Sequence, residues 1–333
     1  MMKISAGISD IKFRGKIRCV LHMVDVLPLL GSVEIMLLDP PSLDFDLNGA
    51  ANVLDMPGLH GMIRQVATDA ITQQMVYPNR LTIVTCETCP AFQMLAPKPL
   101  GVVRITIIEA ANLPQTDFGG LFAIDPYCVV QVGSKSKSTK KTSGNNPVWN
   151  EEFDFPIEYC QSQMINIDVF DSDKLSEDEN LGSVSIDVEH IKENHVLNEW
   201  YDLGNCGKLR IKSIWTPIID EEGKENLESG KSMILSLFMG KLFNRKYKEE
   251  KLVVKLEIES EKDKVVSKCV EQDDDGFVVF NEGFMLMMKK REKKFLIKIF
   301  DVQSNTKIGQ EYVTINHCPD DKVQGYKIDK VLN

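Results

Sequence analysis

Acidic side chains gather in two stretches in the middle of the sequence. The first stretch holds Asp117 and Asp125, and the second holds Asp171, Asp173, Glu177, Asp178 and Glu179. Ionised carboxylates that converge repel one another unless a cation neutralises them or some take up protons. Oxygen ligands without histidine or cysteine favour Ca²⁺, since Mg²⁺ requires a stricter octahedron and Zn²⁺ prefers nitrogen and sulfur. The sequence therefore predicts a calcium site, with a solvated acidic surface as the alternative.

Short strands are predicted to carry these acidic stretches. Strand-like runs of apolar residues, separated by turn residues, lie at 102–108, 128–132, 153–157, 165–170 and 182–188. Their spacing is typical of a β-sandwich. Because a sandwich brings alternate loops together at one end, we expect the two acidic stretches to meet.

The last third of the sequence repeats this pattern. Val148–Phe153 recurs as Val279–Phe284, and Ile167–Asp171 recurs as Ile297–Asp301. Two matches in the same order predict a second sandwich. Only Asp301 remains of the acidic residues in its corresponding loop, so we expect no calcium there.

The first hundred residues follow a different plan. Alternation of apolar and polar residues predicts strands over 13–21 and 43–47, and helical spacing of apolar residues follows Pro57-Gly58 and ends near Pro78. Breaks in the pattern then predict four parts: a first domain at 1–95, a sandwich at 99–218, a linker at 219–231 and a second sandwich at 232–333.

Composition narrows the functional classes. The net charge of −10 argues against nucleic-acid binding, and the 99–218 segment carries most of it, with 10 basic against 18 acidic residues. Eight cysteines without a secretory leader favour reduced thiols in the cytosol. No apolar window is long enough to span a bilayer, so we expect peripheral membrane contact. We find no phosphate-binding glycine loop, nucleophile elbow or metalloprotease histidine pair, and therefore predict that the protein is not an enzyme.

The middle unit resembles the C2 domain of synaptotagmins. The residues that carry the resemblance are Leu113, Asp117, Asp125–Tyr127, Asn146–Glu151, Phe170–Asp173 and Leu181–Gly182. The resemblance implies a calcium site formed by five acidic residues, Asp117, Asp125, Asp171, Asp173 and Glu179. Because Glu179 replaces the usual aspartate, Asp178 stays an alternative fifth ligand, and the number of ions stays open.

Two further groups of residues in this unit are candidates for phospholipid binding. Between the first two aspartates lie the apolar residues Phe118, Leu121 and Phe122, which either insert into the bilayer interface or fold back onto the core. The resemblance also implies that a basic strand binds phosphoinositide headgroups, here through Lys135, Lys137, Lys140 and Lys141. Each lysine near an anionic surface contributes about 1 kcal/mol. A solvated strand is the alternative.

The first segment resembles the C-terminal part of the SMP lipid-transfer domain of extended synaptotagmins. The matching stretches are 31–35, 43–49, 54–59 and 78–80, followed directly by the C2-like unit. The resemblance implies a half-barrel that dimerises and holds acyl chains in an apolar groove, lined here by Val33, Ile35, Leu37, Leu43, Phe45 and Leu47. A plain hydrophobic core is the alternative. About half of that domain and its hydrophobic anchor in the endoplasmic reticulum are missing, so we expect either a fragment or a soluble form.

Together these patterns predict a mainly β protein with some α, in which a partial SMP half-barrel of the TULIP-like α/β type precedes two C2 sandwiches, the second degenerate. The expected function is calcium-dependent binding of anionic phospholipids and phosphoinositides at membrane contact sites, with tethering and glycerolipid transfer. The expected location is the cytoplasmic face of membranes, at contacts of the endoplasmic reticulum with the plasma membrane if an anchor is present, and otherwise the cytosol. The alternatives are a calcium-independent scaffold and a fragment without transfer activity.

Overall fold

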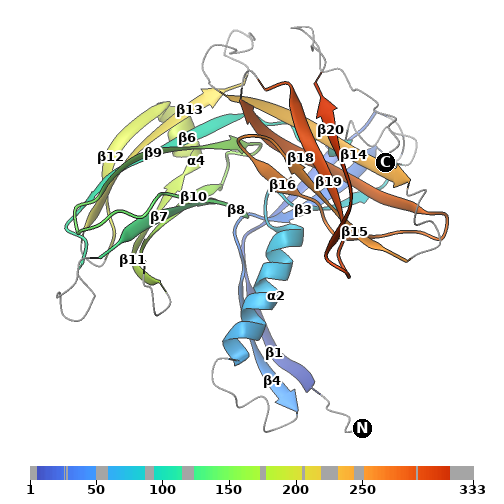
Figure 1. Cartoon of the computed structure of the whole chain (residues 1–333), viewed down its shortest axis with the longest axis horizontal. Coiled ribbons are helices and arrows are strands. Elements are labelled where there is room, and N and C mark those ends of the chain that lie inside the picture. The colour runs from blue at the N-terminus through green and yellow to red at the C-terminus, as the bar shows by residue number, and fades with distance from the viewer. Residues whose placement is uncertain are drawn as a thin grey trace. The chain divides into compact units, whose positions relative to one another are not determined.

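A computed structural model describes most of the chain (Figure 1). The described residues are 6–25, 27, 29–49, 59–86, 94–114, 124–172, 178–204, 207–218, 232–243, 251–289 and 292–315. Contacts divide the chain into two compact units. The first unit comprises residues 1–23, 32–83 and 101–217, and the second comprises 24–31, 84–100 and 218–333.

The first segment of the chain, residues 6–86, contains five strands and a helix. They are β1 (Ala6–Arg14), β2 (Ile17–Met23), β3 (Leu30–Leu37), β4 (Ser42–Gly49), α2 (Leu59–Met75) and β5 (Leu81–Val84). β1 pairs with β4, and β3 lies between β2 and β5 in a three-stranded sheet. The single run predicted over 13–21 is two strands, because the chain leaves the strand path at Gly15 and Lys16. There the Lys16 carbonyl accepts a hydrogen bond from the Leu38 amide at 2.9 Å.

The predicted helix is confirmed as α2. It ends at Met75, shortly before Pro78, whose ring cannot continue a helix. The helix lies beside β4 (Figure 1). Arg64 contacts β4 through an ion pair with Asp44 at 2.7 Å and a hydrogen bond to the Phe45 carbonyl at 3.1 Å. The apolar side chains of the helix are only partly covered, since Met62 on its surface is 65% exposed.

The first sandwich follows as predicted. Its elements are β6 (Gly101–Ala111), β7 (Pro126–Val132), β8 (Lys135–Ser138), β9 (Val148–Ile157), β10 (Met164–Asp171), β11 (Glu179–Asp187), α4 (Val188–Asn194), β12 (Val196–Asp202) and β13 (Lys208–Pro217). The strands form two four-stranded sheets in the orders β11-β10-β7-β8 and β12-β13-β6-β9 (Figure 1). Alternate residues such as Ile105, Val130 and Ile167 are completely buried and form the core between the sheets.

The second sandwich lies in the second compact unit. Its strands are β14 (Ser232–Phe243), β15 (Val253–Glu259), β16 (Lys264–Val266), β17 (Val270–Glu271), β18 (Phe277–Lys289), β19 (Lys294–Asp301) and β20 (Thr306–Thr314). β14 pairs with β18, and the other sheet has the order β16-β15-β19-β20, with β17 beside β15. Side chains from five of these strands form one core cluster that includes Ile258, Val265, Leu286, Phe295 and Val313.

The repeat predicted from the sequence is confirmed by strand order and by strand irregularities. The order β16-β15-β19-β20 reproduces β8-β7-β10-β11, and the pair β14-β18 reproduces β6-β9. Both β9 and β18 carry a bulge that contains an asparagine of positive φ, Asn150 at 52° and Asn281 at 42°. Asparagine tolerates this conformation better than most residues. The same fold is therefore used twice.

Within the described ranges, each helix is too short or too polar to cross a bilayer.

Candidate calcium and phospholipid site

The strand pairing brings three predicted calcium ligands to one edge of the first sandwich. Asp171 is the last residue of β10, where it is paired with Pro126 at the start of β7 on one side and with Glu179 at the start of β11 on the other. Asp125 directly precedes Pro126. The strand pairing therefore brings the backbone of Asp125, Asp171 and Glu179 to the same edge of the sheet.

The pair Asp125 and Asp171 is fixed by hydrogen bonds. The Asp171 side chain is 1% exposed, and its Oδ1 accepts a hydrogen bond from the Asp125 amide at 2.8 Å. In return, the Ser172 amide donates to the Asp125 carbonyl at 3.2 Å. The Ser143 hydroxyl donates to Asp125 Oδ1 at 2.9 Å. These contacts hold two carboxylates at the sheet edge in a defined position.

The two candidates for the fifth ligand differ in their surroundings. Asp178 Oδ2 accepts a hydrogen bond from the Tyr127 hydroxyl at 2.6 Å. Desolvation, with the bond to Asp178 as a second cause, raises the pKa of Tyr127 to about 12. Glu179 is exposed and pairs with Asp171. Glu179 is thus placed to turn toward the site without giving up a bond to Tyr127, and the choice between the two stays a prediction.

Other predicted members of the site lie outside the described residues. These are the ligands Asp117 and Asp173 and the apolar residues Phe118, Leu121 and Phe122. Among the residues that are described, no group of three or more metal-ligating side chains occurs. The members that are described fit calcium by their chemistry, since they offer carboxylate oxygens, and one of these carboxylates is almost completely buried.

The predicted basic strand separates into two pairs of lysines. Lys135 and Lys137 lie on β8, opposite the buried Val132 and Val130. Lys137 is half-buried: its Nζ donates to the Asp154 carbonyl at 3.1 Å.

Lys140 and Lys141 form the other pair and lie exposed in the loop after β8. Lys141 Nζ donates to the Ser172 hydroxyl and lies 5.5 Å from the Tyr127 ring centroid, within reach of a cation–π interaction. Lys141 is therefore next to the acidic edge. The sequence indicated a single basic run and did not indicate this division.

The second sandwich has the same backbone at this edge but different side chains. Asp301 pairs with Val254 and with Thr306, so Val253 occupies the position of Asp125 and Thr306 that of Glu179. The Asp301 carboxylate accepts hydrogen bonds from the amides of Gln303 and Ser304 at 3.3 and 3.0 Å. The hydroxyl bond from Ser304, followed by the Ser304 amide, lowers the pKa of Asp301. The Asp301 carboxylate therefore stabilises the loop that directly follows β19.

The predicted groove residues of the first segment differ in exposure. Leu37 and Phe45 are buried, and Val33, Ile35 and Leu43 are half-buried. The side chain of Leu47 lies outside the described residues.

The neighbouring strand β2 adds exposed apolar side chains that the sequence analysis did not single out. Every second residue of β2 is exposed, and Ile17, Leu21 and Met23 among them are 60%, 60% and 67% exposed. On β5, Leu81 and Ile83 are also exposed. The signal that could have identified the face on β2 is the alternation of apolar residues along the strand.

Comparison with known proteins agrees with this architecture. The C2 domain family model matches residues 101–203, and the model of the synaptotagmin-like mitochondrial-lipid-binding domain matches residues 2–86. Extended synaptotagmin-3 of Mus musculus is 32% identical over 248 residues, which are 72% of this chain and 28% of that protein. Extended synaptotagmin-2-A of Xenopus laevis is 34% identical over 218 residues, which are 63% of this chain and 25% of that protein.

One solved structure is similar over nearly the whole chain. It comprises the SMP domain and the C2 domains A and B of extended synaptotagmin 2, with a TM-score of 0.54 and 26% sequence identity, and the match covers 93% of this chain and 70% of that one.

The fold and these matches define a protein that joins an SMP-type lipid-binding domain to C2 domains. The resemblance to extended synaptotagmins predicted from the sequence is confirmed, with the same domains in the same order. The chain spans 25–28% of the length of the two curated relatives described above.

Proposed function

We propose that the first sandwich binds anionic phospholipid in response to calcium, and that the chain acts as a membrane-binding and lipid-binding part of a tether at membrane contact sites. The observation that carries this proposal is the fixed pair Asp125 and Asp171 at the sheet edge beside Lys141. The similarity to extended synaptotagmins supports a binding role rather than a catalytic one. If an anchor is present, we expect the tether to connect the endoplasmic reticulum with the plasma membrane.

The residues proposed to hold calcium are Asp125 and Asp171, together with the predicted Asp117, Asp173 and either Glu179 or Asp178. Bound calcium supplies positive charge and open coordination positions for phosphate oxygens. Without it, the carboxylates repel an anionic surface. Lys140 and Lys141 add positive charge beside the same edge, which favours phosphatidylserine and phosphoinositide headgroups over neutral lipids.

Vesicle sedimentation tests this proposal. The full chain is mixed with vesicles of phosphatidylserine and phosphoinositide, with calcium or with a chelator. At about 1 kcal/mol for each positive charge near the surface, the two charges of calcium correspond to about a thirtyfold rise in affinity. We expect Asp171→Asn to lose this rise and still to accept the Asp125 amide hydrogen bond. Asp301→Asn, at the matching position of the second sandwich, is the control and should respond like the wild type.

Binding of the wild type to equal extents with calcium and with chelator would contradict the calcium proposal. That result would favour the alternative function, a calcium-independent scaffold. A calcium response that survives in Asp171→Asn and disappears in Asp301→Asn would mean that the calcium site lies in the second sandwich, which contradicts the proposal.

We also propose that the first segment takes up lipid acyl chains on its apolar face, and that it dimerises there. The exposed side chains Ile17, Leu21 and Met23 of β2 support this, because contiguous exposed apolar surface favours an apolar ligand or partner. We expect Leu21→Asp to slow the exchange of fluorescent glycerolipid between vesicles. Val196→Asp, which changes an exposed apolar side chain of the first sandwich, should not. Light scattering of the same variants reports dimerisation. An absence of exchange in the wild type would remove the transfer proposal.

A further inference from the structure

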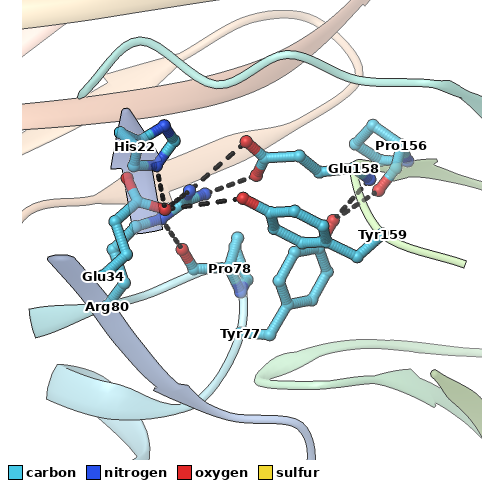
Figure 2. A network of polar contacts seen from close by, with 8 residues as sticks. All are labelled: His22, Glu34, Tyr77, Pro78, Arg80, Pro156, Glu158 and Tyr159. Carbon is cyan, nitrogen blue, oxygen red and sulfur yellow. Dashed lines mark hydrogen bonds and ion pairs between the residues drawn. The ribbon is translucent and has the colours of Figure 1, made fainter. Parts of the chain in front are cut away.

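Tyr77 connects the first segment to the first sandwich. Its amide donates to the Leu37 carbonyl at 2.8 Å, and its carbonyl accepts from the Ser134 amide at 2.7 Å. Its ring is 2% exposed, and its hydroxyl accepts from the Glu158 amide at 3.0 Å and donates to the Pro156 carbonyl at 3.3 Å (Figure 2). One residue therefore satisfies polar groups of both domains.

The turn between β7 and β8 is shaped for this contact. Gly133 has a φ of +59°, and a Cβ added there would lie 2.1 Å from the Tyr77 carbonyl oxygen. Only glycine permits both the left-handed conformation and this close approach. Asn79 adds a hydrogen bond from its side chain to the Ser134 hydroxyl at 3.4 Å. The turn at Gly133 and Ser134 thus fits against the chain that leaves α2.

Arg80 lies between two carboxylates from the two domains (Figure 2). Its guanidinium contacts Glu34 of β3 at 2.8 Å and Glu158, just after β9, at 2.5 Å. All three side chains are at least nine-tenths buried. Burial opposes the charged form, but Glu158 and then Glu34 outweigh it, so the pKa of Arg80 is raised. His22 of β2 faces the same Glu34 carboxylate at 3.4 Å.

Further contacts between the same two domains surround this network. The Arg18 side chain donates to the Gln161 carbonyl, and its guanidinium lies 4.8 Å from the Tyr159 ring centroid. Asn166 at the start of β10 donates to Asp39 Oδ1 at 3.2 Å. Buried charges that are paired and hydrogen-bonded are costly to separate, because separation leaves an uncompensated charge in a nonpolar environment.

We infer that Tyr77, Arg80 and Glu158 form a permanent joint that makes the first segment and the first sandwich one rigid body. The joint meets the sandwich at the end of β7 and the start of β10, whereas Asp125 and Asp171 lie at the opposite ends of these strands. The length of β7 separates them by about 20 Å. The joint therefore leaves the acidic edge free and gives it a fixed direction relative to the apolar face of β2. This inference does not rest on the proposed function.

Distance measurement by electron spin resonance tests the joint in the full chain. Spin labels are placed on Gln73→Cys of α2 and Lys192→Cys of α4, which are both exposed, after the other exposed cysteines are changed to serine. We expect a single narrow distance distribution in this background. Arg80→Met and Tyr77→Phe should broaden it, because each removes polar contacts between the domains. Arg210→Met is the control, since its ion pair with Glu109 lies within the first sandwich.

A broad distribution in the unaltered background would overturn the inference, and so would narrow distributions in both joint variants. If Arg80→Met does not fold, hydrogen exchange of the unaltered chain decides. The amides of Ser134 and Glu158 donate hydrogen bonds across the joint, so we expect them to exchange at least tenfold more slowly than exposed loop amides. Exchange at the rate of exposed loop amides would contradict a permanent joint.

Discussion

Two glycines at matching positions of the two sandwiches have different surroundings. Gly182 lies just after the bulge of β11, opposite Val169 of β10. Gly309 lies just after the bulge of β20, opposite Ile299 of β19. A Cβ on Gly182 would lie 2.5 Å from the Leu203 carbonyl oxygen, whereas the nearest atom to a Cβ on Gly309 is 3.6 Å away. Backbone cannot move aside as a flexible side chain can. The same sequence feature is therefore required in one sandwich and replaceable in the other.

We expect Gly182→Ala to lower the free energy of unfolding of the first sandwich by about 1–3 kcal/mol, as overpacking usually does. Gly309→Ala should change the stability of the second sandwich by no more than about 0.5 kcal/mol. All three tryptophans, Trp149, Trp200 and Trp215, lie in the first sandwich, so their fluorescence during urea unfolding reports on that domain alone. Calorimetry reports on the second sandwich. Equal losses in the two variants would show that the close approach to Leu203 does not matter.

At the scale of elements, the two sandwiches share a hydrogen bond between a hydroxyl side chain and a backbone amide at matching positions. The Thr139 hydroxyl accepts from the Cys128 amide at 2.9 Å, and the Ser267 hydroxyl accepts from the Leu256 amide at 2.8 Å. In each case the backbone of the hydroxyl residue returns a bond to the same partner. These residues extend the pairing beyond the short strands β8 and β16. Small hydroxyl side chains at this position complete the sheet edge in both domains.

The sandwiches, the helix and the acidic edge could be predicted because local patterns specify them. Alternating and apolar runs identified strands of the first segment and five strands of the first sandwich, Pro78 marked the end of the helical pattern, and the two repeated motifs indicated the second sandwich. In the first sandwich, the strands β12 and β13 and the helix α4 were not predicted, and most strands of the second sandwich were indicated only through the repeat. Residues 13–21 alternate without interruption, so the pattern predicts one strand, although the chain turns at Gly15. Alternation does not reveal a turn that leaves the period unchanged.

The joint could not be predicted from sequence patterns. Arg80 binds Glu34 and Glu158, which lie 46 and 78 positions away in the sequence. A buried arginine and a surface arginine have the same sequence signal, and only the three-dimensional arrangement distinguishes them. Likewise, Tyr77 reads as the residue before a proline, a pattern that indicates a turn and not an anchor.

At the scale of the whole molecule, the negative charge and the proposed calcium ligands are both concentrated in the first sandwich. The 99–218 segment holds 18 acidic residues, and Val253 and Thr306 occupy the positions of two acidic residues in the second sandwich. A ligand that binds only the folded state stabilises the domain that holds its site. Calcium should therefore affect the two compact units unequally.

Calorimetry of the full chain with calcium and with chelator measures this difference. At a calcium concentration about one hundred times the dissociation constant, binding adds about 2.7 kcal/mol. For a unit of this size, that raises the midpoint of the first unit's transition by about 5–10 °C. The second unit's transition should stay within about 1 °C, because the Asp301 carboxylate already accepts bonds from Gln303 and Ser304. Tryptophan fluorescence followed during the same temperature scan assigns the transition that belongs to the first sandwich.

Two variants distinguish calcium bound at the acidic edge from calcium bound elsewhere. Asp171→Asn should abolish the shift of the first transition, because it removes a charged ligand that is almost completely buried. Asp301→Asn should lower the second transition, since it weakens the bonds that hold that loop, and should leave the calcium shift of the first transition unchanged. A calcium shift of the second transition in the wild type would contradict the assignment, because it would require ligands in a loop where the strand pairing places valine and threonine.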